Sequence, residues 1–161
     1  MGERTGDGRT AVDRRSEREL VVTRDFDAPV GLVFDAWSKP ELFQRWWAPK
    51  SSGVPLLSCE MDVRTGGGYR VTFGRDASEA MTFFGQYLEV VAGQRMVWTN
   101  DESEDAAVTT VTFEAKGGGT RLVLREVYPS KAALDEAFVG MEDAMPEQFG
   151  QLDELLATLV G

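Results

Sequence analysis

The fold is decided by one stretch near the C-terminus, MEDAMPEQFGQLDELLATL, which spans residues 141–159. Seven apolar side chains recur in it at spacings of three and four, which places them on one face of an α-helix. They are Met141, Met145, Phe149, Leu152, Leu155, Leu156 and Leu159. Acidic and amide side chains fall mostly on the other faces, so the predicted helix is amphipathic and, at about 1.5 Å per residue, roughly 28 Å long. A helix of this kind requires a broad apolar surface to lie on.

The chain before this helix has the pattern of an antiparallel sheet. Residues 19–27 form the first predicted strand, and from Val54 to Leu124 the apolar residues recur with a period of two. Residues 69–73, for example, alternate aromatic or aliphatic side chains with polar ones. Short glycine-containing turns such as residues 116–119 join the later strands. The pattern predicts about seven strands in a meander.

Short helices are predicted at two further places. Residues 30–38 have helical apolar spacing, and the proline that follows opens a second short helix at 40–46. Near the C-terminus, residues 131–138 are predicted as a separate helix that stops near Gly140. Pro146 is expected to kink the long helix or to mark its first turn. The fold class is therefore α+β.

The chain of 161 residues is long enough for one domain, which we place at residues 17–161. Residues 1–16 are polar, of mixed charge and without periodicity, and they predict a disordered N-terminal tail. No apolar run is long enough to cross a membrane, and no secretory signal is evident, so membrane insertion is not expected. The single cysteine, Cys59, fits a reducing cytosol, and the predicted location is cytoplasmic.

Charge and composition exclude several classes of function. The net charge is −10, and seven Asp or Glu but no Lys or Arg follow Lys131, so a cationic surface for nucleic acid is missing. The absence of histidine excludes a Ser-His-Asp triad, a Cys-His dyad and any zinc site that contains histidine. The glycine clusters at residues 66–68 and 117–119 are not followed by the Lys-Ser/Thr of a phosphate-binding loop. We expect no metal and no cofactor.

A set of short segments, in this order and spacing, resembles one bacterial protein family. The segments are FDAP (26–29), VFDAW (33–37), PEL (40–42), RWW (45–47), DVRTGGGY (62–69), Gly85, EVV (89–91), WT (98–99), GGTRL (118–122) and Gly140. Together they cover about residues 19–160. On these residues the chain resembles the family related to the C-terminal domain of the activator of heat-shock-protein-90 ATPase, within the START-like (SRPBCC, helix-grip) superfamily.

The resemblance implies a helix-grip fold, in which a curved antiparallel sheet wraps the long C-terminal helix. The chain departs from the family pattern at Met141, where a tryptophan commonly stands, and at Pro146. The separate N-terminal module of the eukaryotic co-chaperone is missing as well. Stimulation of a chaperone ATPase is therefore not carried over from the resemblance.

This architecture predicts a cavity, because a strongly curved sheet cannot follow a straight helix along its whole length. Methionine suits the wall of such a space, since its flexible side chain adapts to irregular ligands. The same aromatic and methionine pattern also fits a solid core. The predicted lining is Trp37, Trp46, Tyr69, Val71, Phe73, Phe84, Trp98, Phe113, Met141, Met145, Phe149 and Leu152.

The sequence thus predicts binding of an apolar or amphipathic small molecule, such as a lipid, a polyketide or an aromatic metabolite, without catalysis. One alternative is an enzyme of the polyketide cyclase or aromatase type. For it, Tyr69 offers a hydroxyl, and Glu126 a carboxyl whose pKa burial would raise. The other alternative is a module that binds a chaperone partner through its acidic surface. A homodimer also remains open.

Overall fold

The computed structural model describes residues 4–6, 10–48, 50–101 and 103–160. Its helices are α1 (Val30–Ser38), α2 (Pro40–Phe43) and α3 (Lys131–Val160), with 3-10 turns η1 (Lys50–Ser52) and η2 (Ala77–Glu79). Its strands are β1 (Arg4–Gly6), β2 (Thr10–Arg14), β3 (Glu19–Phe26), β4 (Leu56–Met61), β5 (Gly68–Phe73), β6 (Met81–Val91), β7 (Arg95–Trp98), β8 (Val108–Lys116) and β9 (Gly119–Val127).

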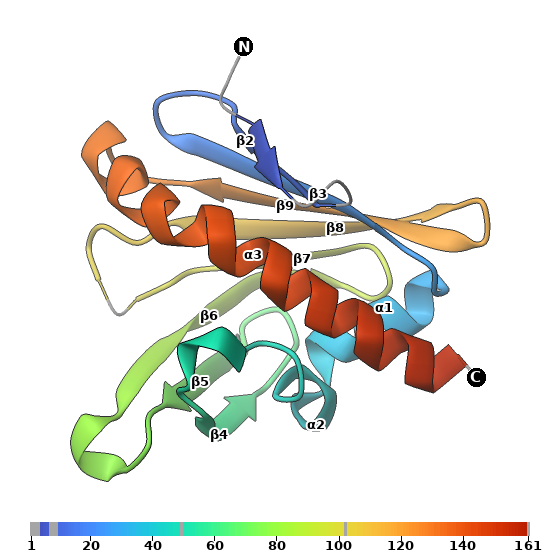
Figure 1. Ribbon diagram of the computed structural model, residues 1–161, viewed down its shortest axis with the longest axis horizontal. Coiled ribbons are helices and arrows are strands. Elements are labelled where there is room, and N and C mark those ends of the chain that lie inside the picture. The colour runs from blue at the N-terminus through green and yellow to red at the C-terminus, as the bar shows by residue number, and fades with distance from the viewer. Residues whose placement is uncertain (1–3, 7–9, 49, 102, 161) are drawn as a thin grey trace.

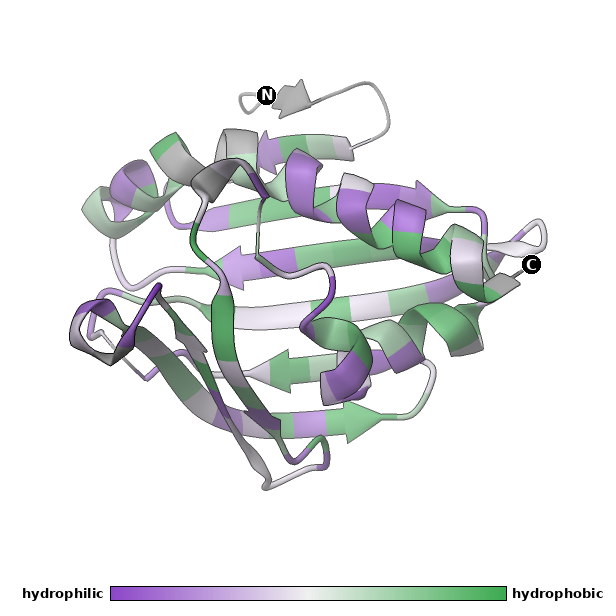
Figure 2. Ribbon diagram, turned by 60° about the horizontal axis from the view of Figure 1, so that its bottom comes forward, coloured by the Kyte–Doolittle hydropathy of each residue, from purple (hydrophilic) through white to green (hydrophobic). Residues whose placement is uncertain are grey.

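All described strands belong to one antiparallel sheet in the order β1-β2-β3-β9-β8-β7-β6-β5-β4. The seven strands predicted from the sequence are β3 to β9, and the predicted α+β class is confirmed. Helices α1 and α3 lie on the same face of this sheet (Figure 1). Apolar and polar residues alternate along the strands (Figure 2), as expected for a sheet with one covered face.

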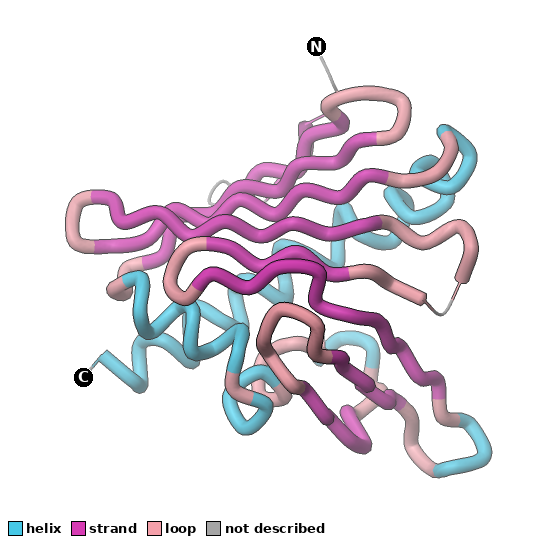
Figure 3. The backbone as a smooth tube through the Cα atoms, turned by 180° about the vertical axis from the view of Figure 1, so that it is seen from behind, coloured by secondary structure: helices cyan, strands magenta, loops and turns pink. Residues whose placement is uncertain are grey.

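The sheet bends along β6, the longest strand. The pairing of β6 with β7 shifts its register between Tyr87 and Glu89, so one extra residue interrupts the ladder there. A bulge of this kind bends the strand and increases its twist. Strand β5 pairs with the first part of β6, and β4 pairs with β5. Figure 3 shows this part of the sheet turned away from the flatter region formed by β7, β8, β9 and β3.

Helix α3 is continuous from Lys131 to Val160, with both Gly140 and Pro146 inside it. The predicted stop near Gly140 is therefore wrong. The helix starts where the sequence indicates, since the Ser130 hydroxyl oxygen accepts a hydrogen bond from the amide of Ala133 at 3.1 Å. No helix in the described part of the chain is both long and apolar enough to cross a membrane.

Tertiary packing explains why α3 continues. Leu134 and Phe138 precede Gly140, Met145 and Phe149 follow it, and all four are buried in the core. A glycine within a helix costs only about 1 kcal/mol relative to alanine, and an amphipathic helix gains most of its stability from its buried face. Packing on both sides of the glycine therefore outweighs the local signal to stop.

Residues 4–6 and 10–14 form strands, whereas the sequence predicts a disordered tail at 1–16. Residues 1–3 and 7–9 of that predicted tail lie outside the described residues. Strand β1 pairs with β2, and β2 pairs with β3 along its whole length. Val12 is fully buried in the core, and Thr10 accepts a hydrogen bond at 2.6 Å from the buried guanidinium of Arg24. Composition missed these strands because a short edge segment gains its backbone hydrogen bonds from the sheet.

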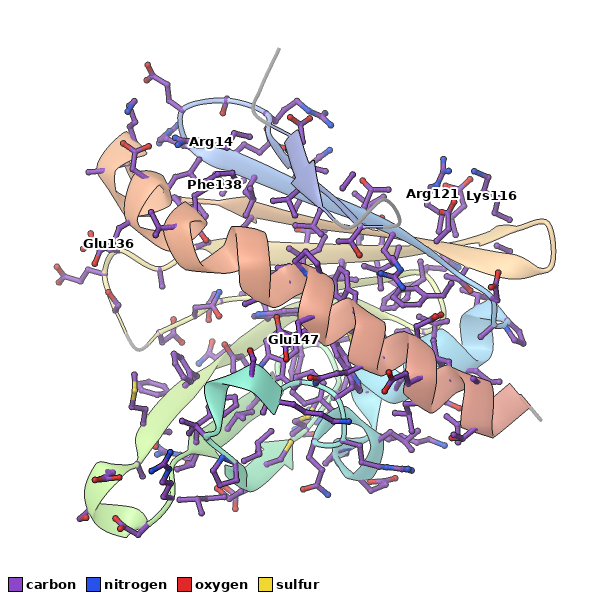
Figure 4. The ribbon with its side chains drawn as sticks, viewed as in Figure 1. Arg14, Lys116, Arg121, Glu136, Phe138 and Glu147 are labelled. Carbon is purple, nitrogen blue, oxygen red and sulfur yellow. The ribbon has the colours of Figure 1, made fainter. Side chains whose placement is uncertain are left out.

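Charged contacts join this N-terminal region to α3. Arg14 forms an ion pair with Asp135 at 2.5 Å, and its guanidinium lies 5.4 Å from the ring centre of Phe138 (Figure 4). Arg24 on β3 reaches Asp153 at 3.8 Å. Strand β2, which lies before the predicted domain boundary, therefore helps to hold the first half of α3 against the sheet, and β3 helps to hold the second half.

Truncation of Val12 tests whether β2 belongs to the folded core. We expect Val12→Ala to lower the free energy of unfolding by about 2 kcal/mol, because it removes two buried methyl groups and leaves a cavity. Urea denaturation measures the difference, and Arg15→Ala at an exposed neighbouring site is the control. Equal stability of the two variants would show that β2 does not pack as described.

Candidate functional site

A cavity of about 250 Å³ lies where the bent part of the sheet leaves the helices. We call it the aromatic cavity. Its lining is Trp37, Phe43, Trp47, Met61, Tyr69, Val71, Phe73, Phe83, Tyr87, Met96, Trp98 and Asn100. Ligand pockets commonly measure about 300–1,000 Å³, so this space suits a small compact molecule better than a long acyl chain.

Trp37 of α1 lies at the centre of the aromatic wall. Its ring centre is 6.0 Å from that of Trp98 and 5.9 Å from that of Trp47, and Trp47 stacks on Phe43 at 4.8 Å. The Nε1 atom of Trp37 is buried, and no acceptor in the described part of the chain bonds to it. Rings from α1, from α2 and the segment after it, and from the sheet therefore form one continuous apolar surface. The indole N–H of Trp37 is a hydrogen-bond donor without an acceptor among the described residues.

The segment that carries Trp47 is fixed to α3 by amide side chains. Gln148 donates a hydrogen bond to the carbonyl oxygen of Trp47 at 2.5 Å, and Gln151 donates to those of Trp46 and Ala48, each at 2.9 Å. These bonds satisfy the backbone of an irregular segment that would otherwise lose contact with water. They hold Trp47 at the edge of the cavity.

A second set of bonds fixes the next residues of this segment. The carboxylate of Glu147, labelled in Figure 4 in the middle of α3, accepts hydrogen bonds from the amide and the hydroxyl of Ser51. These bonds hold the pKa of Glu147 below its usual value. Gln151 also accepts a bond from the amide of Lys50 at 2.9 Å. The position of the wall therefore depends on α3.

The polar end of the aromatic cavity is formed by Tyr69 and Asn100. The Tyr69 hydroxyl donates to the carbonyl oxygen of Thr99 at 2.8 Å and lies 3.0 Å from Oδ1 of Asn100. Gly85 makes room for this arrangement, because a Cβ there would lie 2.1 Å from the Thr99 oxygen and 3.0 Å from the Tyr69 ring. A side chain at position 85 would displace the tyrosine.

The hydrogen bonds continue from Asn100 to the half-buried carboxyl of Glu126. Nδ2 of Asn100 lies 3.2 Å from the Thr109 hydroxyl, which donates to Oε2 of Glu126 at 2.9 Å. The Tyr128 hydroxyl donates to Oε1 of the same carboxyl at 2.8 Å. Tyr69 and Glu126, the two candidates for acid–base chemistry, are thus joined through Asn100 and Thr109.

Glu126 lines a second hollow of about 580 Å³ between the sheet, the β7–β8 loop and the first half of α3. We call it the Glu126 hollow. Its lining is Phe83, Asn100, Ser103, Asp105, Ala106, Ala107, Glu126, Tyr128, Ala133, Glu136, Ala137 and Met145. Phe83 and Asn100 also line the aromatic cavity, so the two spaces adjoin each other.

Comparisons with known proteins agree with this geometry. The sequence profile of the family described as "Activator of Hsp90 ATPase homolog 1-like protein" matches residues 27–157. The chain belongs to this family. A comparison with curated proteins gave no match.

Solved structures of the same fold come from several bacteria. A Rhodobacter sphaeroides protein is 22% identical with a TM-score of 0.83, and the match covers 92% of this chain and 97% of that one. A Nitrosomonas europaea protein is 22% identical with a TM-score of 0.80, and the match covers 91% of this chain and 99% of that one. A Rhizobium leguminosarum protein is 28% identical with a TM-score of 0.69, and the match covers 87% of this chain and 94% of that one. The fold is the helix-grip fold of the START-like superfamily.

The predicted lining residues divide into five groups. Those at the aromatic cavity are Trp37, Tyr69, Val71, Phe73 and Trp98, and Met145 lines the Glu126 hollow instead. Those in the core are Trp46, Phe113, Phe149 and Leu152. Phe84 is exposed, and the side chain of Met141 lies outside the described part of the structure.

The direction of each side chain explains the residues that were misplaced. Trp46 turns into the core, where its indole donates to the carbonyl oxygen of Ala36 at 3.0 Å, and Trp47 takes its place at the cavity. On β6 the odd-numbered Phe83 lines the cavity, whereas Phe84 points to the outer face under the guanidinium of Arg70. A shift of one residue along a strand reverses the face.

The lining residues missed from the sequence are Phe43, Trp47, Met61, Phe83, Tyr87, Met96 and Asn100. The β6 residues could have been found, because Phe83 and Tyr87 share one parity along the strand and the polar Gln86 has the other. Asn100 carried no such signal, since it follows β7 in a loop that reads as a solvated acidic turn.

The electrostatics of the site centre on Glu126. Removal from water raises the pKa of its carboxyl above the usual 4.5, and the hydrogen bonds from Tyr128 and Thr109 oppose part of this rise. Burial raises the pKa of Cys59 to about 11, so this half-buried thiol stays protonated at neutral pH. No group of three acidic or cysteine side chains in the described chain is placed to hold a metal ion.

The raised pKa of Glu126 makes stability depend on pH. The folded state keeps the proton of Glu126 to a higher pH than the unfolded chain does. The contribution of this proton to the free energy of unfolding is therefore largest below the unfolded pKa, and it is lost as pH rises through the folded pKa. Glu126→Gln removes this titration. We therefore expect the variant to gain stability relative to the parent protein as pH rises above the unfolded pKa of glutamate, about 4.3.

Urea unfolding at a series of pH values measures this gain. The control is Glu154→Gln, which alters an exposed carboxyl on α3. A stability difference between Glu126→Gln and the parent that stays constant across the series would contradict the burial of this carboxyl.

Proposed function

We propose that the protein binds a small apolar or amphipathic molecule in the aromatic cavity. The observation that carries the proposal is a space of about 250 Å³ whose wall is almost entirely aromatic and aliphatic, with Tyr69 and Asn100 as its polar end. Pockets for small molecules commonly combine an apolar wall with a few positioned polar groups. Membership of a family with the helix-grip fold supports this reading.

The shape of the space favours a flat ring system over a lipid tail. Phe113, Phe149 and Leu152 are buried in the core, and the aromatic cavity itself is confined to the bent end of the sheet. Aromatic rings attract another ring in offset or edge-on geometry at centre distances of about 4.5–7 Å. An aromatic metabolite or a small polyketide is therefore the preferred ligand class.

An enzyme of the cyclase or aromatase type is the second candidate. One observation favours it, namely the carboxyl of Glu126 with a raised pKa in an open hollow, since such groups serve as general acids or bases. Tyr69 is less suited to catalysis, because its hydroxyl already donates to the Thr99 carbonyl. A carrier should keep its affinity in Tyr69→Phe, whereas an enzyme that uses this hydroxyl should lose turnover.

Partners and location remain predictions. A chaperone partner that recognises the acidic surface should bind less tightly at high ionic strength, because salt screens exposed charges. A homodimer and a cytoplasmic location are likewise expectations from the sequence.

A substitution that fills the aromatic cavity tests the main proposal. Val71 of β5 is buried and lines the cavity. We expect Val71→Phe to weaken binding of the neutral fluorescent probe N-phenylnaphthylamine by about tenfold or more, because the added ring occupies the space of the ligand. Fluorescence titration measures the affinity, and circular dichroism verifies the fold.

The matched control is Thr72→Phe, which adds the same ring on the next residue of β5. Its hydroxyl pairs with that of Thr82 at 3.1 Å, on the outer face. This control should bind the probe as the parent does. If Val71→Phe binds normally as well, the ligand does not enter the aromatic cavity.

A further inference from the structure

The Glu126 hollow contains a half-buried carboxyl that forms no ion pair within the described residues. Glu126 forms no ion pair with any lysine or arginine in the described part of the chain, and its hydrogen bonds come from the neutral hydroxyls of Thr109 and Tyr128. Buried charges in proteins are commonly paired, because an isolated charge loses its hydration. A carboxylate has about four lone-pair positions, so further donors can bind to it.

The surroundings of Glu126 also favour a positive charge. Asp105 and Glu136 line the same hollow, and Figure 4 shows Glu136 on the first half of α3 beside the β7–β8 loop. No lysine or arginine is among the described residues that line it. The electrostatic potential in the hollow is therefore negative, and it opposes an anionic ligand.

The chemistry of the hollow fits an organic cation better than a metal ion. No described group of three acidic or cysteine side chains is placed to bind a metal. Phe83 and Tyr128 instead offer aromatic rings in the same lining, and ring faces attract ammonium groups. A protonated amine combines hydrogen-bond donors for Glu126 with a charge that these rings accommodate.

The two spaces adjoin at Phe83 and Asn100, so one molecule can occupy both. We propose that the ligand is an amphipathic amine, whose ring lies in the aromatic cavity and whose ammonium group binds Glu126 in the adjoining hollow. This inference rests on the proposed function, because the ring is held by the aromatic cavity. It adds the sign of the ligand's charge and the residue that pairs with it.

Three probes that differ only in the polar end test the inference. They are naphthylethylamine, naphthylethanol and naphthylacetate, titrated into the full chain by isothermal calorimetry at neutral pH. We expect the amine to bind about tenfold or more tightly than the alcohol, and the carboxylate more weakly than both, because a partly buried charge pair strengthens binding. Equal affinities for amine and alcohol would overturn the inference and leave the aromatic cavity as the binding site.

Substitution of Glu126 tests the residue itself. Glu126→Gln should abolish the preference for the amine and leave the affinity for the alcohol within about twofold. Glu136→Gln is the matched control, a carboxyl of the same hollow that should retain most of the preference. An amine preference that persists in folded Glu126→Gln would overturn the assignment of this residue.

The Val71→Phe variant separates the two proposals. It should weaken the amine and the alcohol alike, because both place the naphthalene ring in the aromatic cavity. If the parent protein binds the amine and the alcohol equally well, and Val71→Phe weakens both, the result counts against the inference alone. Failure of all three probes to bind the parent protein counts against the aromatic cavity as well. The comparison in the parent protein decides the inference even if Glu126→Gln fails to fold.

Discussion

The packing of one long helix against a sheet that bends away from it is the constraint on which the rest of the structure depends. Buried residues of α3, including Leu134, Phe149 and Leu156, lie against the flatter strands, and the bulge of β6 after Tyr87 turns the remaining strands aside. Because the helix is stiff and the sheet is bent, α3 cannot stay in contact with the sheet along its whole length. The aromatic cavity is the space that results, and α1 and α2 close part of it.

The same helix positions the wall of the cavity. Glu147, Gln148 and Gln151 bind the backbone between Trp46 and Ser51, and this segment carries Trp47. Strands β2 and β3 also hold α3, through the ion pairs of Arg14 with Asp135 and of Arg24 with Asp153. Since α3 holds both the wall of the aromatic cavity and the sheet, a change in α3 should affect ligand affinity and the free energy of unfolding together.

The polar network adds chemistry to this geometry. Tyr69, Asn100, Thr109, Glu126 and Tyr128 come from β5, β8, β9 and two loops, yet they form a connected set of hydrogen bonds. The half-buried carboxyl of Glu126, held by neutral donors, is the group from which we infer a preference for a cationic ligand, which apolar walls cannot supply. Recognition of an amphipathic ligand then requires both adjoining spaces.

The sequence by itself determined the α+β class, the seven strands β3 to β9 and the apolar stripe of α3, because periodicity depends only on local geometry. It also placed five of the cavity's residues, including Trp37, on the correct face. Tertiary structure alone decided that β2 joins the sheet, that α3 runs through Gly140, and that Trp47 rather than Trp46 lines the cavity. These outcomes depend on contacts between distant segments, which local patterns do not encode.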